Sequence, residues 1–268
     1  MENNLDVSVI LPIESSKHKN FIELFSNAIL SIKQQTVGVK EVVIVHSGEE
    51  SLESILTSYD YSGLTVNLVK NYGKTDFASQ MNLGVESANS EWVSFLEFDD
   101  EYSSIWFKNV KRYAEAYPEF DSFLSLVIDT DDKGAFAGFT NEATFAASMN
   151  TVIGILTNEV LLSYQNFQTS GMVIKKSTYQ SYGGFKPSMK LTFVYEFLLR
   201  LTYNSVNMMT IPRIGYKHTN LREGSIFWNY KNGEQRMTDD EVRFWLESAK
   251  KEHFFVDDRN IKYEPTDV

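Results

Sequence analysis

Apolar runs with the composition of strands alternate with segments of helical spacing along the first 117 residues, and this alternation limits the fold more than any other feature. Buried strands are expected at residues 7–11, 41–45, 64–69 and 92–96. Helices with one apolar face are expected at residues 21–32, 51–58, 76–88 and 104–117. Strands that alternate with helices form right-handed βαβ units, so the sequence predicts an α/β fold with a mostly parallel sheet flanked by helices.

The second half of the chain contains shorter elements. Strands are expected at residues 123–128, 170–175, 208–211 and 213–216, and helices at residues 177–182 and 191–203. Residues 135–168 lack a clear period, and we expect them to form a mobile segment over the site. Thr238 and Glu241 match a capping box that begins a last helix. We therefore predict a domain over residues 1–225 and a C-terminal extension over residues 226–268 that packs on it.

The composition excludes several classes of function. The 268 residues are 43% hydrophobic and 14% aromatic, which is enough to bury a full core. The net charge is −11 and Lys and Arg form no run, which argues against nucleic acid as a partner. The chain has no cysteine, so it has no disulfide, thiolate metal site or thiol nucleophile. Without a signal-peptide pattern or an apolar run of about 20 residues, we expect a soluble cytoplasmic protein with no transmembrane segment.

A cluster of carboxylates marks the predicted site. The apolar run at residues 92–96 ends in Glu97, Asp99, Asp100 and Glu101. Ligands bind at the carboxyl ends of the strands in open α/β sheets, and crowded carboxylates repel each other unless a cation holds them. The cluster therefore predicts a divalent metal site with oxygen ligands and a phosphate-bearing substrate, with a solvated acidic turn as the alternative.

Three groups of segments, in order, carry a family resemblance. The first is Val7–Pro12, the helix end Gln34-Gln35-Thr36 and Glu41–Val45; the second is Asn82–Val85 and Phe95–Asp100; the third is Gly171, Tyr182–Phe185, Leu199–Leu201, Ile211-Pro212 and Tyr216–His218. Over about residues 7–225 this order resembles the nucleotide-sugar-dependent glycosyltransferases of family 2. The resemblance implies the GT-A fold, which is a Rossmann-like sheet with helices on both sides.

The resemblance also implies roles for single residues. Glu97 and Asp99 stand at the two acids of the family's metal motif, of which the first contacts the ribose and the last binds Mn²⁺ or Mg²⁺. His218 matches a late histidine that some relatives use near the metal, although a surface or capping histidine is the alternative. Asp100 is expected to hold the turn or to bind the acceptor. The other residues assigned to nucleotide or substrate binding are Pro12, Glu14, His46 and Asn82.

Two positions depart from the family pattern. His46-Ser47 stands where the family commonly has two aspartates that read the nucleobase, so only stacking or a hydrogen bond from His46 is expected there. Phe193 and Val194 stand where the family has Glu-Asp, of which the Asp is the general base. The nearest carboxylate is Glu196, which we take as the candidate base although a helix turns it about 200° away from Val194. An Arg-paired structural role is the alternative for Glu196.

The sequence therefore predicts an inverting glycosyltransferase of the hexosyltransferase type. It would move a sugar from a nucleotide-sugar donor to a hydroxyl of a glycan or another acceptor, with Mn²⁺ or Mg²⁺ as cofactor. The alternative is an inactive GT-A domain that binds a sugar or nucleotide or serves as a structural interaction protein. A nucleotidyltransferase ranks last because no Gly/Arg-rich phosphate loop lies near Pro12. The sugar, the base, the acceptor and the oligomeric state are not predicted.

Overall fold

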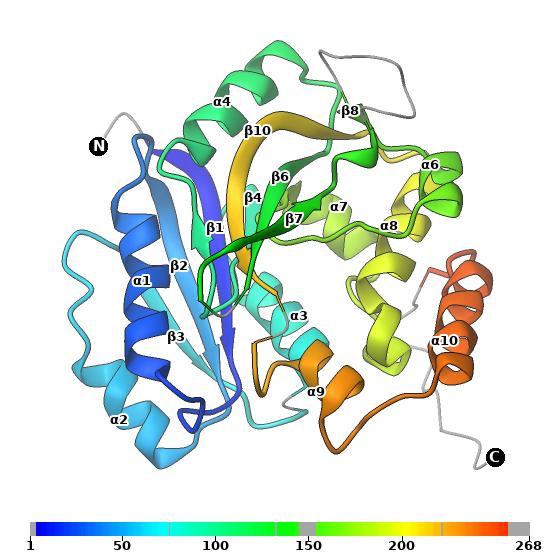
Figure 1. The fold of residues 1–268 in the computed structure, drawn as a ribbon. Coiled ribbons are helices and arrows are strands. Elements are labelled where there is room, and N and C mark those ends of the chain that lie inside the picture. Colours follow the sequence, from blue (N-terminus) through cyan, green and yellow to red (C-terminus); the bar gives the residue numbers. More distant parts are fainter. Residues whose placement is uncertain (1–3, 75, 132, 145–153, 221, 257–268) are drawn as a thin grey trace.

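The computed structural model describes residues 4–74, 76–131, 133–144, 154–220 and 222–256. Its strands form one mixed sheet with helices on both faces (Figure 1). The strands are β1 Leu5–Ile13, β2 Val39–His46, β3 Val66–Lys70, β4 Trp92–Phe95, β5 Glu101–Tyr102, β6 Ser122–Thr130, β7 Phe136–Thr140, β8 Gly154–Ile155, β9 Val173–Lys175 and β10 Met208–Thr219. The helices are α1 Phe21–Lys33, α2 Glu50–Ser58, α3 Phe77–Ser87, α4 Trp106–Ala116, α6 Asn158–Ser163, α7 Lys176–Ser181, η1 Pro187–Thr192, α8 Phe193–Tyr203, α9 Ile226–Asn232 and α10 Asp239–Glu252.

The first half of the sheet has the predicted parallel arrangement. Its order is β3-β2-β1-β4, and each neighbouring pair is parallel. A buried apolar core lies on each face of the sheet, with α1, α2 and α4 over one face and α3, α7 and α8 over the other (Figure 1). The α/β fold class is therefore confirmed. This half brings the carboxyl ends of β1 and β4 side by side.

The second half of the sheet is mixed rather than parallel. The short strand β9 is antiparallel to both β4 and β6, and β6 is parallel to β10. The two strands predicted at 208–211 and 213–216 are one long strand, β10, whose register shifts between Ile211 and Tyr216. Pro212 lies at this irregularity and has no N–H for the ladder, so the chain bends there without ending the strand.

The two-residue strand β5 was not predicted, and it fixes the position of the acidic turn before it. Tyr102 and Glu101 pair with Tyr216 and Lys217 of β10. This pairing places the acidic turn after β4 beside the residues that follow Tyr216. Gly171 supports the same arrangement, because its φ of 72° suits glycine and an added Cβ would lie 2.8 Å from the Tyr216 ring.

The C-terminal helix packs on the core. The capping box of Thr238 and Glu241 begins α10 as predicted, and Ala249 on its inner face is fully buried. The Lys186 ammonium group donates hydrogen bonds to the carbonyls of Glu252 (3.0 Å) and Phe255 (2.8 Å). The division of the chain at residue 225 stays a prediction. None of the helices in the described ranges is both long and apolar enough to span a membrane.

The segment at residues 135–168 has more regular structure than the sequence indicated. It contains β7, β8 and α6, and residues 145–153 lie outside the described part. Gln165, Asn166, Phe167 and Gln168 line the main cavity, so the end of this segment does lie at the site. Its mobility stays a prediction.

Candidate active site

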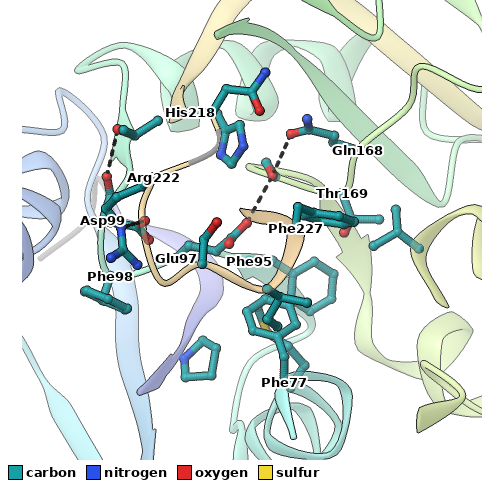
Figure 2. Close-up of a pocket in the computed structure, with 18 of the residues that line it drawn as sticks. Phe77, Phe95, Glu97, Phe98, Asp99, Gln168, Thr169, His218, Arg222 and Phe227 are labelled. Atoms are coloured by element: carbon teal, nitrogen blue, oxygen red, sulfur yellow. Dashed lines mark hydrogen bonds and ion pairs between the residues drawn. The ribbon is translucent and has the colours of Figure 1, made fainter. Parts of the chain in front are cut away.

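One cavity of about 420 Å³ opens where β1 and β4 end (Figure 2). Its walls come from the loop after β1, the start of α3, the turn after β4, residues 165–170, the start of α8, the end of β10 and the start of α9. The lining residues used below are Pro12, Glu14, His18, Phe77, Met81, Phe95, Glu97, Phe98, Asp99, Gln168, Ser170, Phe193, Val194, Tyr216, His218, Arg222, Ser225, Ile226 and Phe227. Asp99 and Arg222 lie on one side of it with the Phe98 ring, and Phe77 and Phe227 lie away from them (Figure 2).

Glu97 is held at the floor of the acidic side. Its backbone N–H donates a hydrogen bond to the Tyr216 hydroxyl (3.0 Å), and the Ser170 hydroxyl lies 3.4 Å from its carboxylate. Burial, followed by the negative charges of Asp100 and Asp99, raises the pKa of Glu97 to about 8, although nearby His218 opposes the shift. The raised pKa therefore reflects mainly the burial of the Glu97 carboxyl group and, second, the two nearby carboxylates.

Asp100 and His218 form a buried pair. The Asp100 carboxylate is 2.9 Å from Nδ1 of His218 and accepts the backbone N–H of Thr219 at 2.9 Å. Burial alone would lower the pKa of His218, but the charge and hydrogen bond of Asp100, helped by Glu97 and Asp129, raise it to about 10. His218 is therefore an imidazolium at neutral pH in this arrangement.

Asp99 points away from that pair and contacts Arg222. Nε of Arg222 lies 2.5 Å from the Asp99 carboxylate, and both side chains are almost buried. The Arg222 guanidinium also lies 5.1 Å from the Phe98 ring centre, and the His18 ring lies 5.0 Å from the same ring. Burial and then Asp100 raise the pKa of Asp99, whereas Arg222 lowers it.

The side chains that could share a metal ion differ in one member from the predicted set. One ligand atom each from Glu97, Asp100 and His218 lie within 4.8 Å of one another. The sequence suggested Glu97, Asp99 and His218. In the structure Asp100 stands with the other two, and Asp99 is outside this group and paired with Arg222.

Comparison with known proteins places the chain in a family. The model of the family described as "Glycosyl transferase family 2" matches residues 17–158, more than half of the chain. The chain belongs to this family. The predicted family is therefore confirmed.

Two curated glycosyltransferases are similar to this chain over part of their length. An uncharacterized glycosyltransferase of Haemophilus influenzae is 25% identical over 172 residues, which cover 64% of this chain and 55% of that protein. The amylovoran biosynthesis glycosyltransferase AmsB of Erwinia amylovora is 28% identical over 102 residues, which cover 37% of this chain and 32% of that protein. The chain thus spans about half or less of the curated relatives it matches.

Solved structures support the fold. S. aureus TarS 1-349 in complex with UDP-GlcNAc has a TM-score of 0.65 at 15% identity, covering 94% of this chain and 68% of that one. The same fragment in complex with UDP has a TM-score of 0.61 at 15% identity, covering 93% and 72%. At this identity the likeness shows that the chain shares the GT-A type of fold.

Two predicted nucleotide-binding residues of the family 2 pattern lie outside the cavity lining. His46 is 3% exposed at the end of β2, and burial lowers its pKa. The side-chain amide of Asn82 holds a glycine turn instead: it donates to the carbonyl of Phe185 (2.8 Å) and accepts from the Tyr179 hydroxyl (2.6 Å) and the Phe185 N–H (3.0 Å). Pro12 and Glu14, by contrast, line the cavity.

Glu196 is placed where it does not meet a substrate. It is fully buried and binds Arg200 twice (2.9 and 2.7 Å) and Lys186 (3.0 Å). Its position supports the Arg-paired structural role and not the role of general base. Phe193 and Val194, at the family 2 base position, do line the cavity.

Arg222, His18 and Tyr216 were not predicted as site residues from the sequence. Arg222 and His18 are far from the acidic cluster in sequence, and only the bend of β10 and the loop after β1 bring them to Phe98. Tyr216 belongs to the segment Tyr216–His218 that resembles the family, but its hydrogen bond to Glu97 depends on the pairing of β5 with β10. The sequence signal that could have indicated Arg222 is its position four residues after His218, the predicted metal ligand.

Proposed function

We propose that the chain transfers a sugar, a hexose, from a nucleotide-sugar donor to an acceptor hydroxyl with inversion at the anomeric carbon. The observation that carries the proposal is the meeting of Glu97, Asp99 and His218 in one cavity with Pro12 and Glu14 at the carboxyl ends of β1 and β4. Ligands of open α/β sheets bind at this edge. The family membership supports glycosyl transfer, and the nucleotide-sugar donor and the inversion are our proposals.

We further propose that a divalent ion, Mn²⁺ or Mg²⁺, binds to Glu97, Asp100 and His218, and that the His218 ring releases its proton when the ion binds, because only the neutral ring is a metal ligand. Carboxylate oxygens suit both ions, and the ligand atoms of Glu97, Asp100 and His218 lie within 4.8 Å of one another. When bound, such an ion neutralises the charge of the departing diphosphate.

The side chains around this group prepare it for a phosphate-bearing ligand. Tyr216 and Ser170 fix the backbone and carboxylate of Glu97, and Asp100 fixes the ring of His218 through Nδ1. Arg222 supplies a guanidinium group at the cavity wall, where it can exchange Asp99 for a diphosphate oxygen. Phe98 and His18 close the wall behind Arg222 and exclude water from it.

A second function has one specific observation in its favour. Val194 and Phe193 line the cavity at the position where the family carries its general base, and neither accepts a proton. The same cavity could therefore belong to an inactive domain that binds a nucleotide or a sugar. Turnover of a donor distinguishes the two functions.

Thermal unfolding with a panel of nucleoside diphosphates, each with and without Mn²⁺, tests the donor site. We expect one diphosphate to raise the melting temperature only when Mn²⁺ is present, because a ligand of the folded state stabilises it in proportion to its affinity. Glu97→Gln should abolish the shift, and Glu115→Gln on the exposed face of α4 should keep it. No shift with any diphosphate would overturn the proposal, and NMR of the product anomer tests the inversion.

A further inference from the structure

The side of the cavity opposite the acids is an aromatic wall. It consists of Phe77 and Met81 from α3, Phe193 and Val194 from α8, Phe95 from β4 and Phe227 from α9. The rings of Phe77 and Phe193 are 5.8 Å apart, so the starts of α3 and α8 meet through these side chains. Phe227 is 44% exposed and lines the same cavity as Phe95 and Phe77. An aromatic ring of a ligand can pack against such side chains.

Among the residues that the structure describes, this wall contains no carboxylate that could accept a proton. The carboxylates among the described lining residues are Glu14 from the β1 loop and Glu97 and Asp99 from the turn after β4. Asp99 is paired with Arg222, and Glu97 lies against Ser170. The lining residues from α3 and α8 bring no carboxylate to the wall where Val194 stands. An acceptor bound at this wall must lose its proton without a general base at Val194, the position where the family carries one.

From these two features we infer that the acceptor is a phenol, with its ring on the aromatic wall and its hydroxyl directed toward the acidic side. The inference rests on the proposed function. A phenolic hydroxyl loses its proton with a pKa of about 10, whereas the corresponding value for water is about 15.7. A phenol therefore provides the anionic oxygen that an aliphatic alcohol would yield only with a strong general base.

The reaction balances without any further reactant. The bond between the anomeric carbon and the diphosphate oxygen breaks, and its electron pair stays on the nucleoside diphosphate. The phenolic oxygen forms the new bond to the anomeric carbon. The phenolic proton passes to water, so the products are an aryl glycoside, the nucleoside diphosphate and a solvated proton.

Two isomeric acceptors test the inference in the wild-type protein. The compounds 4-methylphenol and benzyl alcohol have the same atoms and the same ring, and differ in the acidity of the hydroxyl. With the donor identified by thermal shift, we expect kcat/KM for 4-methylphenol to exceed that for benzyl alcohol about 100-fold, the size of a typical base contribution. Phenol should exceed cyclohexanol in the same way.

Each result decides between the two proposals. Equal or better transfer to benzyl alcohol overturns the phenol inference and leaves the donor site intact. Donor hydrolysis without transfer to any phenol also overturns it. If no donor is hydrolysed or bound, the proposed function itself fails.

A variant that restores a base gives a second test. Val194→Asp should raise transfer to benzyl alcohol about tenfold or more over the isosteric Val194→Asn, with a smaller gain for 4-methylphenol. A purely structural role of Val194 would change transfer to both acceptors equally.

Phe227→Ala should raise KM for 4-methylphenol about fivefold relative to Phe227→Leu, with kcat changed less. Equal effects on both acceptors, or no change in KM, would contradict the inference.

Discussion

The ion pair between Asp99 and Arg222 shows how single residues determine the shape of the site. Both side chains are nearly buried, at 8% and 11% exposed, so either charge is costly without the other. We expect Arg222→Met to lower the free energy of unfolding by about 3 kcal/mol, because it leaves the Asp99 carboxylate buried without its partner. Adding Asp99→Asn to Arg222→Met should restore most of the lost free energy of unfolding, because the carboxylate charge is then also removed. Urea unfolding of the two single variants and the double variant measures this. An additive double variant would contradict the coupling.

Glu41 gives a pH-dependent prediction at the residue scale. Its carboxylate accepts hydrogen bonds from the Ser8 hydroxyl (2.7 Å), the Asn89 N–H (2.6 Å) and the Asn89 side-chain amide (3.3 Å). Burial would raise the pKa of Glu41, but these bonds outweigh it and lower the pKa below 4.5. A carboxyl group whose pKa is lower in the folded state stabilises the fold at pH values above its pKa in the unfolded state. This stabilisation is lost as the pH falls through its pKa in the folded state.

We therefore expect Glu41→Gln to reduce the free energy of unfolding by about 2 kcal/mol at pH 7. The difference from wild type should shrink as the pH falls below 4.5, where Glu41 in the wild type takes up a proton. Urea unfolding at pH 7, 5 and 3.5 measures it. Glu91→Gln, an exposed residue nearby, is the control. A loss that is constant with pH would show that hydrogen-bond geometry, and not charge, is responsible.

The sequence predicted the acidic cluster but not which acid faces which partner. Glu97 was correctly expected at the end of a strand, because the apolar run stops there. Asp99 and Asp100 are adjacent, and only the turn closed by the Asp100 N–H and the Glu97 carbonyl (3.2 Å) sends them to different partners. Their partners are more than a hundred residues away in sequence: His218 lies on β10, and Arg222 lies just after it. A single sequence does not show how β5 pairs with β10, and this pairing decides which residues meet.

At the scale of elements, helical geometry predicted more than strand pairing. The sequence argument placed Glu196 about 200° from Val194 on one helix. In the structure Val194 lines the cavity and Glu196 is buried against Arg200. The long bent β10 and the two-residue β5 were missed, because a bend at Pro212 and a short pairing leave no periodic signal.

The contact between Lys186 and the end of α10 predicts how that helix is held. Lys186 joins Glu196 to the carbonyls of Glu252 and Phe255. Lys186→Met should remove these bonds, so we expect faster amide hydrogen exchange across α10 with little change in β1 and β4. Lys231→Met on exposed α9 is the control. Unchanged exchange in α10 would show that its apolar face alone holds it.

At the scale of the whole molecule, the cavity joins the two halves of the sheet. Glu97 and Asp99 follow β4 in the parallel half, whereas His218 lies at the end of β10 in the mixed half and Arg222 follows that strand. Ser225, Ile226 and Phe227 close the cavity from α9, a helix with no buried residue. A ligand that contacts both halves should therefore stabilise α9 far more than the core strands, which are already well protected.

Hydrogen exchange with and without the diphosphate identified by thermal shift measures this coupling. With Mn²⁺ present, we expect amide exchange to slow at least about tenfold in residues 222–232, which corresponds to about 1.4 kcal/mol of local stabilisation. Residues 97–100 should slow as well, since they share the ligand. Glu97→Gln should remove both effects together, because one bound ligand connects them. Protection confined to residues 97–100 would show that the ligand stays on the parallel half and that α9 takes no part in binding.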